Sequence, residues 1–351
     1  MMDRETLLKA VRFQTPDYIP MTFHVNQACW EHYDQAALQD LIMEHNQLFP
    51  DYVPRKLPYT PDYPPYADAT IPFTDPWGSV WKTSMSGIIG AVVEHALDSW
   101  DKFDEFKAPD PEITTHWGPI DWEMEASGSN PIGFFSCLRS GEIGHGHTFL
   151  KLIDLRGYSN LLLDMVDEEP RLSRLIELVD EYNLALAHNF LHRAKVEWLG
   201  FAEDLGMQQG PMISPDLFRK FIKPSYIKLM KLTKKAGAVV HMHSDGDIRT
   251  LFDDILDCGV EVLNIQDLVN GLDWLEREVK GKVCLDLDVD RQGITYSGSP
   301  RQIDELIRQE VSRLGDRRGG LMLIYGLYPG VPLENARALM DAMERYSTYF
   351  S

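Results

Sequence analysis

Short apolar runs alternate with longer amphipathic segments from about residue 130 to the end of the chain. The apolar runs predict strands over residues 132–137, 198–202, 238–242, 260–265, 282–287 and 320–324. The segments between them predict helices over residues 147–156, 159–167, 170–195, 215–235, 247–257, 271–279, 299–313 and 332–348. Such alternation joins parallel strands through crossover helices, and a series this long favours a closed barrel over a doubly wound sheet. The pattern therefore predicts the α/β class and, within it, a single (β/α)8 TIM barrel.

The first 130 residues have a different character. Proline and tyrosine crowd residues 50–76, which predicts an ordered loop, because dense proline is incompatible with a regular helix or a central strand. Residues 19–23 predict the first barrel strand. Residues 77–82 and 91–95 predict two short strands joined as a hairpin.

These patterns predict an elaboration and a regular series within one domain. Residues 1–130 form the N-terminal helical and hairpin elaboration, which includes the first barrel strand. Residues 131–351 form the regular strand–helix units. We therefore expect a single domain over residues 1–351, which is long enough for one large barrel.

Polar side chains follow the predicted strands at the point where each strand ends. In a (β/α)8 barrel the carboxyl ends of all strands meet on one rim, and this rim holds the chemistry. The residues at these ends carry carboxylates, imidazoles or a phenol, and they are Glu203, Asp204, His243, Asp245, Asp267, Asp288 and Tyr325. Their shared position predicts an active site on this rim.

The most informative of these strand ends is the one that contains two histidines. His241 and His243 are two residues apart, so on an extended strand both side chains point to the same face. Two imidazoles in this arrangement suit a divalent metal or a proton-transferring pair. Asp247 precedes a predicted helix, which favours a role as the cap of that helix. A second motif, His145-Gly146-His147, also resembles a metal-binding pair, but its Gly-rich loop opens a helix and favours a structural role.

Charge narrows the range of partners. The 351 residues carry a formal net charge of −20, which repels nucleic acid phosphates and anionic lipid. No run of about 18 apolar residues is present, and the N-terminus lacks the basic-then-apolar pattern of a signal peptide. We therefore expect a cytoplasmic protein that binds neither nucleic acid nor membranes.

Several segments, taken in order and spacing, resemble the uroporphyrinogen decarboxylase superfamily. They lie at residues 73–78, 155–161, 204–206, 210–218, 221–224, 243–248 and 332–335. The resemblance runs through nearly the whole chain and implies a (β/α)8 barrel. Barrels of this superfamily commonly pair, so it also implies a homodimer.

True uroporphyrinogen decarboxylases carry an arginine-rich RQAGRY segment near the N-terminus, which binds the carboxylates of the substrate. At the corresponding place this chain has residues 24–32, HVNQACWEH, without an arginine. Binding an eight-carboxylate tetrapyrrole without those arginines, on a protein of charge −20, is electrostatically unfavourable. This difference disfavours uroporphyrinogen as the substrate.

The other branch that the chain resembles contains zinc-dependent, corrinoid-dependent methyltransferases. Their pattern is His-x-Cys at a strand end and a later cysteine. Here the pattern aligns with His241-Met242-His243, and residues 321–326 contain no cysteine. The resemblance therefore implies zinc in a site richer in nitrogen and oxygen ligands, and a cobalamin (corrinoid) cofactor carried by a partner protein.

We accordingly expect a methyltransferase that passes a methyl group from a small methylated substrate, such as an aryl methyl ether or a methylamine, to a corrinoid protein. The expected catalytic residues are His241, His243, Asp245, Glu203 and Tyr325. The expected substrate-binding residues are His24, Asn26, Trp30, Asp204, Asp288 and Tyr328. The expected metal ligands are His241, His243 and Asp267.

Two alternatives stay open. A decarboxylase or lyase of the same superfamily would use the histidines and aspartates as acid and base without a metal. A binding protein would keep the barrel without the chemistry. The concentration of ionisable groups on one rim argues against the second alternative, because such groups are costly to keep unpaired.

Overall fold

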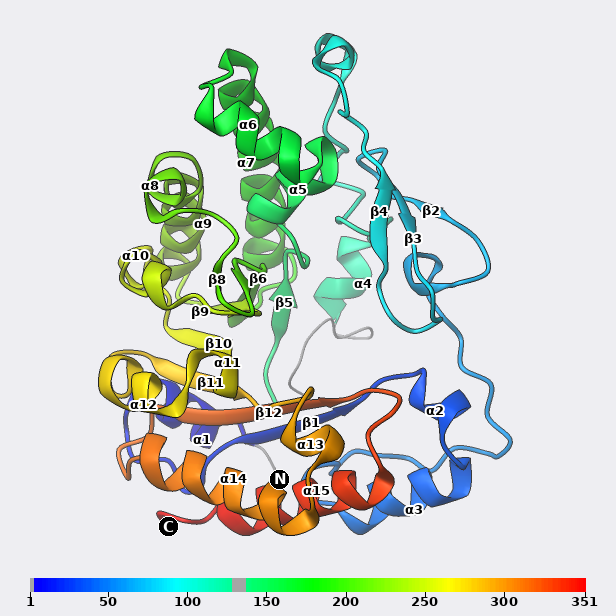
Figure 1. Cartoon of the computed structure of the whole chain (residues 1–351), viewed down its shortest axis with the longest axis vertical. Helices are drawn as coiled ribbons and strands as arrows, with labels where there is room; N and C mark the ends of the chain where they lie inside the picture. The colour runs from blue at the N-terminus through cyan, green and yellow to red at the C-terminus, as the bar shows by residue number, and fades with distance from the viewer. Residues whose placement is uncertain (1–2, 128–136) are drawn as a thin grey trace. The chain divides into compact units, whose positions relative to one another are not determined.

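The computed structural model describes residues 3–127 and 137–351, which form two compact units (Figure 1). Unit 1 consists of Met1–Pro64, Met85–Ile88 and Val262–Ser351. Unit 2 consists of Pro65–Ser84 and Ile89–Glu261. Each unit contains parallel strands and the helices that follow them.

The parallel strands of unit 1 come from both ends of the chain. They are β1 (Met21–Val25), β10 (Val262–Gln266), β11 (Cys284–Asp288) and β12 (Leu321–Leu327), in the order β1-β12-β11-β10. The first strand pairs with the last, and Met21 lies opposite Leu323. A barrel requires this pairing of first and last strands. All five residues of β11 are buried, including its two aspartates, as expected for a parallel strand covered on both faces.

The helices of unit 1 belong to the N-terminal segment or follow the strands β10, β11 and β12. They are α1 (Arg4–Val11), α2 (Cys29–His32), α3 (Gln35–Glu44), α11 (Asp267–Asn270), α12 (Leu272–Trp274), α13 (Ile294–Ser297), α14 (Pro300–Leu314) and α15 (Leu333–Tyr346). A π-helical turn, Leu275–Val279, continues α12. The two long C-terminal helices, α14 and α15, lie side by side (Figure 1). Ser299 and Gln302 form a capping box at the start of α14, and Pro300 takes its first position, which fixes where this helix begins.

The described residues of unit 2 form three parallel strands and two small antiparallel sheets. The parallel strands β5 (Ser140–Glu142), β6 (Trp198–Ala202) and β9 (Val239–Ser244) have the order β9-β6-β5, so β6 lies between the other two. The first antiparallel sheet contains β2 (Phe73–Thr74), β3 (Val80–Lys82) and β4 (Ala91–Glu94), and its β3–β4 pairing confirms the predicted hairpin. The second joins β7 (Gly206–Met207) to β8 (Gly210–Pro211).

The helices of unit 2 lie between its strands along the chain or follow β9. They are α4 (Trp122–Ser127), α5 (Phe149–Arg156), α6 (Tyr158–Val166), α7 (Pro170–His192), α8 (Pro215–Leu217), α9 (Lys223–Lys235) and α10 (Phe252–Asp257). Short 3-10 helices lie at Pro65–Ala67, Trp100–Glu105 and Arg249–Leu251. The helix predicted over residues 215–235 is present but contains a π-helical turn, Phe218–Ile222, between α8 and α9. Ser214 caps α8 by accepting a hydrogen bond from the Leu217 N–H at 3.3 Å.

The structure confirms the α/β class with parallel strands, whereas the closed barrel and the single domain over residues 1–351 stay predictions. The strand predicted over residues 132–137 lies outside the described residues, apart from Cys137. Within residues 3–127 and 137–351, no helix combines the length and the apolar character that crossing a membrane requires.

Candidate functional site

Three neighbouring strands of unit 2 bring ionisable side chains to their carboxyl ends. Asp204 follows β6, the middle strand, after a gap of one residue. His243 lies in β9, one residue before that strand ends, and its Cα pairs with Ala202 of β6. His145 lies in the loop after β5, the strand on the other side of β6. The strand order alone therefore places an aspartate between two histidines.

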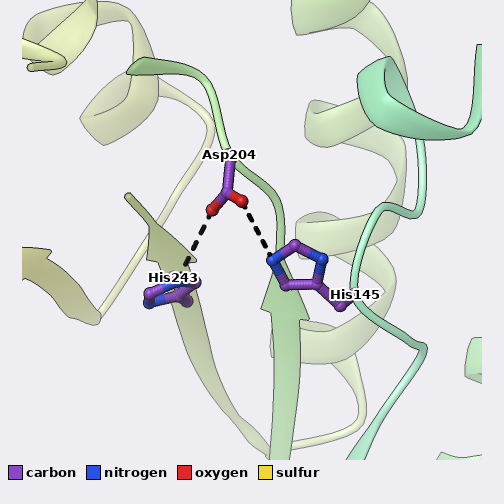
Figure 2. Close-up of side chains that lie close together, drawn as sticks. All are labelled: His145, Asp204 and His243. Atoms are coloured by element: carbon purple, nitrogen blue, oxygen red, sulfur yellow. Dashed lines mark ion pairs between the residues drawn. The ribbon is translucent and has the colours of Figure 1, made fainter. Parts of the chain in front are cut away.

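The side chains of these three residues meet (Figure 2). The His145 Nε2 atom is 3.3 Å from one Asp204 carboxylate oxygen, and the His243 Nε2 atom is 3.6 Å from the other. The two imidazole rings have their centroids 6.1 Å apart. His243 Nε2 also lies 3.6 Å from the Asp245 carboxylate. We call His145, Asp204 and His243 the His-Asp-His group.

Backbone hydrogen bonds hold this group in place beyond the end of the sheet. The Glu203 N–H donates to the His243 carbonyl at 3.0 Å, and the Asp245 N–H donates to the Asp204 carboxylate at 3.0 Å. On the other side, the Gly146 N–H donates to the Ala202 carbonyl at 2.8 Å. Gly146 adopts a φ of 78°, a left-handed conformation that favours glycine, so the turn after His145 needs this residue.

The charges in the group support one another. Burial of the Asp204 carboxyl acts to raise its pKa, but the contacts with the His145 and His243 imidazoles outweigh burial and hold the pKa well below its ordinary value. Burial acts to lower the pKa of His145, and the hydrogen bond to Asp204 outweighs it, so this pKa is raised. Asp204 is therefore a carboxylate at neutral pH and stabilises positive charge on its neighbour.

The same three side chains have the spacing of metal ligands. One ligating atom from each of the three lies within 4.8 Å of the others. Tetrahedral zinc, with bonds of about 2.0–2.1 Å to nitrogen and oxygen, puts neighbouring ligand atoms roughly 3.3–3.4 Å apart. The separations of 3.3 and 3.6 Å between imidazole nitrogen and carboxylate oxygen are close to this value. Catalytic zinc sites use three protein ligands of these types and leave the fourth position to water or substrate, so the donor set fits zinc.

The predicted partner of His243 takes a different position. His241 is buried, and its ring lies against Trp198 with centroids 5.3 Å apart. It does not belong to the His-Asp-His group. The structure thus brings His243, Asp204 and Asp245 of the predicted set together in unit 2, and it adds His145. The catalytic and metal-binding roles assigned to His241 stay predictions.

Glu203, a predicted catalytic residue, is fully buried among hydrogen-bond donors. One of its carboxylate oxygens accepts from the backbone N–H groups of Thr148 and Leu150, at 3.0 and 2.8 Å, at the start of α5. The Tyr226 hydroxyl donates to the other oxygen. The pKa of Tyr226 is raised well above its ordinary value by burial and by the nearby Glu203 charge. These contacts suit a residue that positions the loop of His145, and the catalytic role of Glu203 stays a prediction.

In unit 1, the predicted substrate-binding residues near β1 have mixed surroundings. Burial lowers the pKa of His24, the fourth residue of β1. The Asn26 side chain donates to the Gly87 carbonyl at 2.9 Å and accepts from the Ala28 N–H at 2.8 Å. Trp30 is buried, and its ring packs edge-to-face on Tyr59 at 5.5 Å. Asn26 and Trp30 therefore stabilise the local fold, and their binding roles stay predictions.

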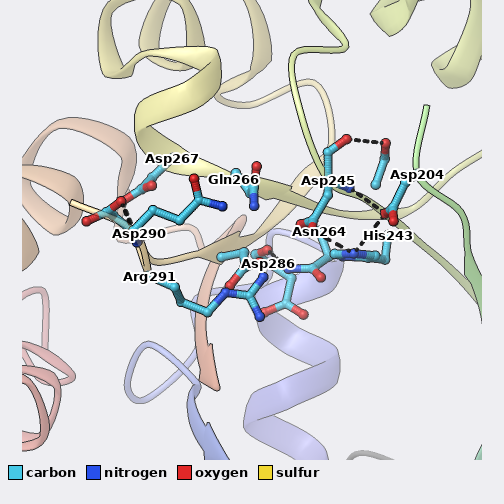
Figure 3. Close-up of polar contacts among 12 residues, drawn as sticks. Asp204, His243, Asp245, Asn264, Gln266, Asp267, Asp286, Asp290 and Arg291 are labelled. Atoms are coloured by element: carbon cyan, nitrogen blue, oxygen red, sulfur yellow. Dashed lines mark hydrogen bonds and ion pairs between the residues drawn. The ribbon is translucent and has the colours of Figure 1, made fainter. Parts of the chain in front are cut away.

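The other predicted residues of unit 1 lie at the ends of β10, β11 and β12. Asp267 is buried and accepts backbone hydrogen bonds from Leu268 and Asp290, at 2.5 and 3.0 Å (Figure 3). Burial raises the pKa of Asp267. Asp288 is buried and accepts a hydrogen bond of 2.6 Å from the Arg291 guanidinium. These contacts hold both carboxylates in place, whereas the predicted role of Asp267 as a metal ligand is not tested by them.

Two tyrosines of unit 1 were also predicted to belong to the site. Tyr325 lies in β12 and is fully buried; its hydroxyl donates to the Thr295 hydroxyl at 3.2 Å, and burial raises its pKa to about 12. Tyr328 follows β12 and is about a third exposed, with the Arg291 guanidinium 5.6 Å from its ring centroid. Both tyrosines line one cavity of this unit.

His145 is the member of the group that sequence reasoning left out. Its signal was visible as His145-Gly146-His147, but a Gly-rich loop before a helix favoured a structural interpretation. That interpretation suits His147, which is fully buried and hydrogen-bonds the Thr148 hydroxyl at 2.7 Å. His145 is partly exposed beside Asp204. Only the order of β5, β6 and β9 distinguishes His145, a member of the His-Asp-His group, from the structural His147.

Comparison with known proteins identifies the family. The model of the uroporphyrinogen decarboxylase (URO-D) family matches residues 149–346, more than half of the chain. The methylcobamide:CoM methyltransferase MtaA of Methanosarcina barkeri is 25% identical over 138 residues, which is 38% of each chain. The uroporphyrinogen decarboxylase of Homo sapiens is 27% identical over 147 residues, again 38% of each chain. The chain therefore aligns with about two fifths of the length of these relatives.

Solved structures show weaker likeness. The dihydropteroate synthase of Anaplasma phagocytophilum superimposes with a TM-score of 0.36 and 17% identity, over 50% of this chain and 69% of that one. The 3-keto-D-glucoside 4-epimerase YcjR of E. coli gives a TM-score of 0.35 and 15% identity, over 65% and 88% of the two chains.

Proposed function

The chain belongs to the uroporphyrinogen decarboxylase family, and we propose that it is a methyltransferase that moves a methyl group from a small methylated substrate to a corrinoid protein. The similarity to a methylcobamide:CoM methyltransferase supports this branch of the family. The absence of arginine from residues 24–32, in a protein of charge −20, argues against a tetrapyrrole with eight carboxylates.

The observation that carries the proposal is the His-Asp-His group. Breaking the C–O or C–N bond of a methyl ether or methylamine requires a strong nucleophile and a leaving heteroatom that is protonated or bound to a Lewis acid. A reduced corrinoid on the partner protein would supply the nucleophile. A zinc ion held by His145, Asp204 and His243 would supply the Lewis acid at the leaving heteroatom.

The protein's own residues prepare this site in two ways. Asp204, a carboxylate at neutral pH, orients both imidazoles through its two oxygens. Glu203 holds the backbone at Thr148 and Leu150, and so fixes the loop that carries His145. In the absence of a metal, the same contacts would keep an imidazolium at His145 able to donate a proton to the leaving heteroatom.

A second candidate, a decarboxylase or lyase that needs no metal, is favoured by the similarity to human uroporphyrinogen decarboxylase. In that reaction the His145–Asp204 pair would deliver a proton to the carbon that loses carbon dioxide. Metal content separates the two candidates, because a proton relay alone needs none.

The test measures metal content and methyl transfer on the same samples. We expect about one zinc per chain by elemental analysis, lost in the double variant His145→Ala/His243→Ala. The matched control is His188→Ala/His192→Ala, two exposed histidines on α7 with ring centroids 4.3 Å apart, which should keep the zinc. Methyl transfer from a panel of aryl methyl ethers and methylamines to cob(I)alamin is followed by the absorbance change of the corrinoid.

Zinc and methyl transfer that are both lost with His145 and His243 would support the proposal. Zinc-free wild-type protein that releases carbon dioxide from a carboxylated substrate would favour the lyase. Zinc that stays in the double variant would show that the His-Asp-His group does not bind it.

A further inference from the structure

Unit 1 contains a cavity of about 350 Å³ at the carboxyl ends of β11 and β12. A volume of this size accommodates one substituted aromatic ring. The residues that line the cavity come from β12, from α13 and from the loops that follow β11 and β12, and they include Arg291, Tyr296, Tyr325, Gly326 and Tyr328. In the unit to which it belongs, the cavity lies where parallel α/β folds bind their ligands.

The wall of the cavity is aromatic and fixed. Tyr325 is fully buried and anchored by Thr295, whereas Tyr296 is 51% exposed and Tyr328 is 37% exposed. The loop that carries Tyr328 is held by Tyr33, whose hydroxyl donates to the Val331 carbonyl at 2.6 Å. Covering such fixed, water-exposed rings with a flat apolar ligand is energetically favourable.

The floor of the cavity includes a position without a side chain. A Cβ atom added at Gly326 would lie 3.1 Å from the Tyr328 ring and 3.7 Å from an Arg291 guanidinium nitrogen. The backbone at Gly326 has no left-handed φ, so turn geometry does not demand glycine here. What glycine provides at this position is open space beside the tyrosine and the arginine.

The charge that lines the cavity is positive. Among the described residues that line it, Arg291 alone carries a formal charge, in a protein whose net charge is −20. Asp288 does not line the cavity, but its carboxylate accepts a hydrogen bond of 2.6 Å from the Arg291 guanidinium. Arg291 is labelled in Figure 3. Arg291 is therefore pre-oriented, and a planar guanidinium of this kind pairs well with a carboxylate.

We propose that this cavity binds a planar aromatic ring that carries an anionic group, as in a benzoate, with the ring against Tyr296 and Tyr328 and the anionic group at Arg291. That this ligand is also the methyl donor, a methoxylated aromatic acid, rests on the proposed function. The binding site itself rests only on the residues of unit 1.

The experiment measures the affinity of the full chain for benzoate, 4-methoxybenzoate and the neutral ether methoxybenzene by calorimetry. We expect both acids to bind more tightly than the ether. The double variant Asp288→Asn/Arg291→Gln removes both charges of the ion pair together, so no buried carboxylate is left alone. It should weaken binding of the acids by about tenfold to a hundredfold and leave binding of the ether unchanged.

Two further variants keep the result interpretable. Arg318→Gln breaks another arginine–aspartate pair of unit 1, with Asp316, away from the cavity, and should leave all three affinities unchanged. Gly326→Ala places a methyl group in the cavity beside Tyr328 and should weaken binding of the acids and of the ether alike. The proposal is overturned if wild-type protein does not bind benzoate, or if the Asp288→Asn/Arg291→Gln variant binds it as tightly.

The failure of this inference and that of the proposed function are distinguishable. Tight binding of benzoates without methyl transfer from 4-methoxybenzoate to cob(I)alamin would support the cavity and contradict the methyltransferase. Methyl transfer from methoxybenzene without benzoate binding would support the methyltransferase and contradict the cavity.

Discussion

At the scale of single residues, buried carboxyl groups in this protein have opposite properties. Contacts with the imidazoles of two histidines hold the pKa of Asp204 well below its ordinary value, despite burial. Glu310, on α14, is fully buried, and burial together with the neighbouring Asp267 raises its pKa well above the ordinary value of 4.5. The first carboxyl is charged at neutral pH, whereas the second keeps its proton to a higher pH than an ordinary glutamate does.

Glu310 is therefore expected to make stability depend on pH. Because the folded state binds the Glu310 proton more tightly than the unfolded state, this contribution is fully present below the unfolded pKa and is lost as pH rises through the folded pKa. Glu310→Gln removes the titrating group, so it should stabilise the protein at alkaline pH by on the order of 1–3 kcal/mol, with a smaller gain near pH 5.

Urea denaturation between pH 5 and pH 9 measures this effect. The control is Glu305→Gln on the same helix, where the bonds from Arg308 and Gln309 lower the pKa of an exposed carboxyl to about 2. That variant should show no gain at alkaline pH. An equal pH profile for Glu310→Gln and wild type would contradict the buried proton.

At the scale of elements, a strand end organises the start of a helix. Glu203, one residue past β6, accepts the N–H groups of Thr148 and Leu150, which the first turn of α5 leaves without partners inside the helix. The interaction joins residues that are more than 50 positions apart in the sequence. The loop that carries His145 is thus fixed by β6 as well as by its own turn.

Glu203→Ala is expected to lower the free energy of unfolding by about 1–3 kcal/mol, because the N–H groups of Thr148 and Leu150 and the buried Tyr226 hydroxyl lose their acceptor. Chemical denaturation at neutral pH measures the change. Glu177→Ala, an exposed position on α7, serves as the control and should stay within about 0.5 kcal/mol of wild type. A Glu203 variant as stable as this control would show that the cap contributes nothing.

Elements were predicted well where the local pattern decides them. The strand over residues 198–202 was predicted at the residues that β6 occupies. The strand predicted to end at residue 242 continues as β9 to Ser244, because its pairing with β6 extends to His243. Polar residues after an apolar run signal a strand end in the sequence, but the paired partner decides where the strand stops.

At the scale of the whole molecule, net charge opposes compactness. The chain has 54 acidic and 34 basic side chains, so at least 20 acidic groups cannot each have a lysine or arginine of their own. Their mutual repulsion is screened as the Debye length shrinks from about 30 Å at 0.01 M salt to about 10 Å at 0.1 M. The urea midpoint should therefore rise over this range of sodium chloride. Glucose at matched osmolality is the control, and a midpoint that falls with salt would contradict the expectation.

The family match confirms the relationship inferred from the ordered segments. Those segments could be recognised because their order and spacing are read directly from the sequence. The alternation of strands and helices could also be predicted from the sequence, since apolar periodicity and capping residues act over a few positions. His243 and Asp204 could be placed at strand ends for the same reason. The homodimer and the corrinoid partner stay predictions.

Which of these strand ends meet depends on the order of the strands in the folded sheet. The order β9-β6-β5 brings His145 to Asp204, whereas the local pattern joined His243 to His241. Likewise, Arg291 lines a cavity together with residues of β12 because β11 pairs with β12. The spacing of residues along the chain does not specify this pairing. The physical reason is the same in both cases: local periodicity determines which face of a strand a side chain occupies, but the neighbour of that strand depends on packing across the whole sheet.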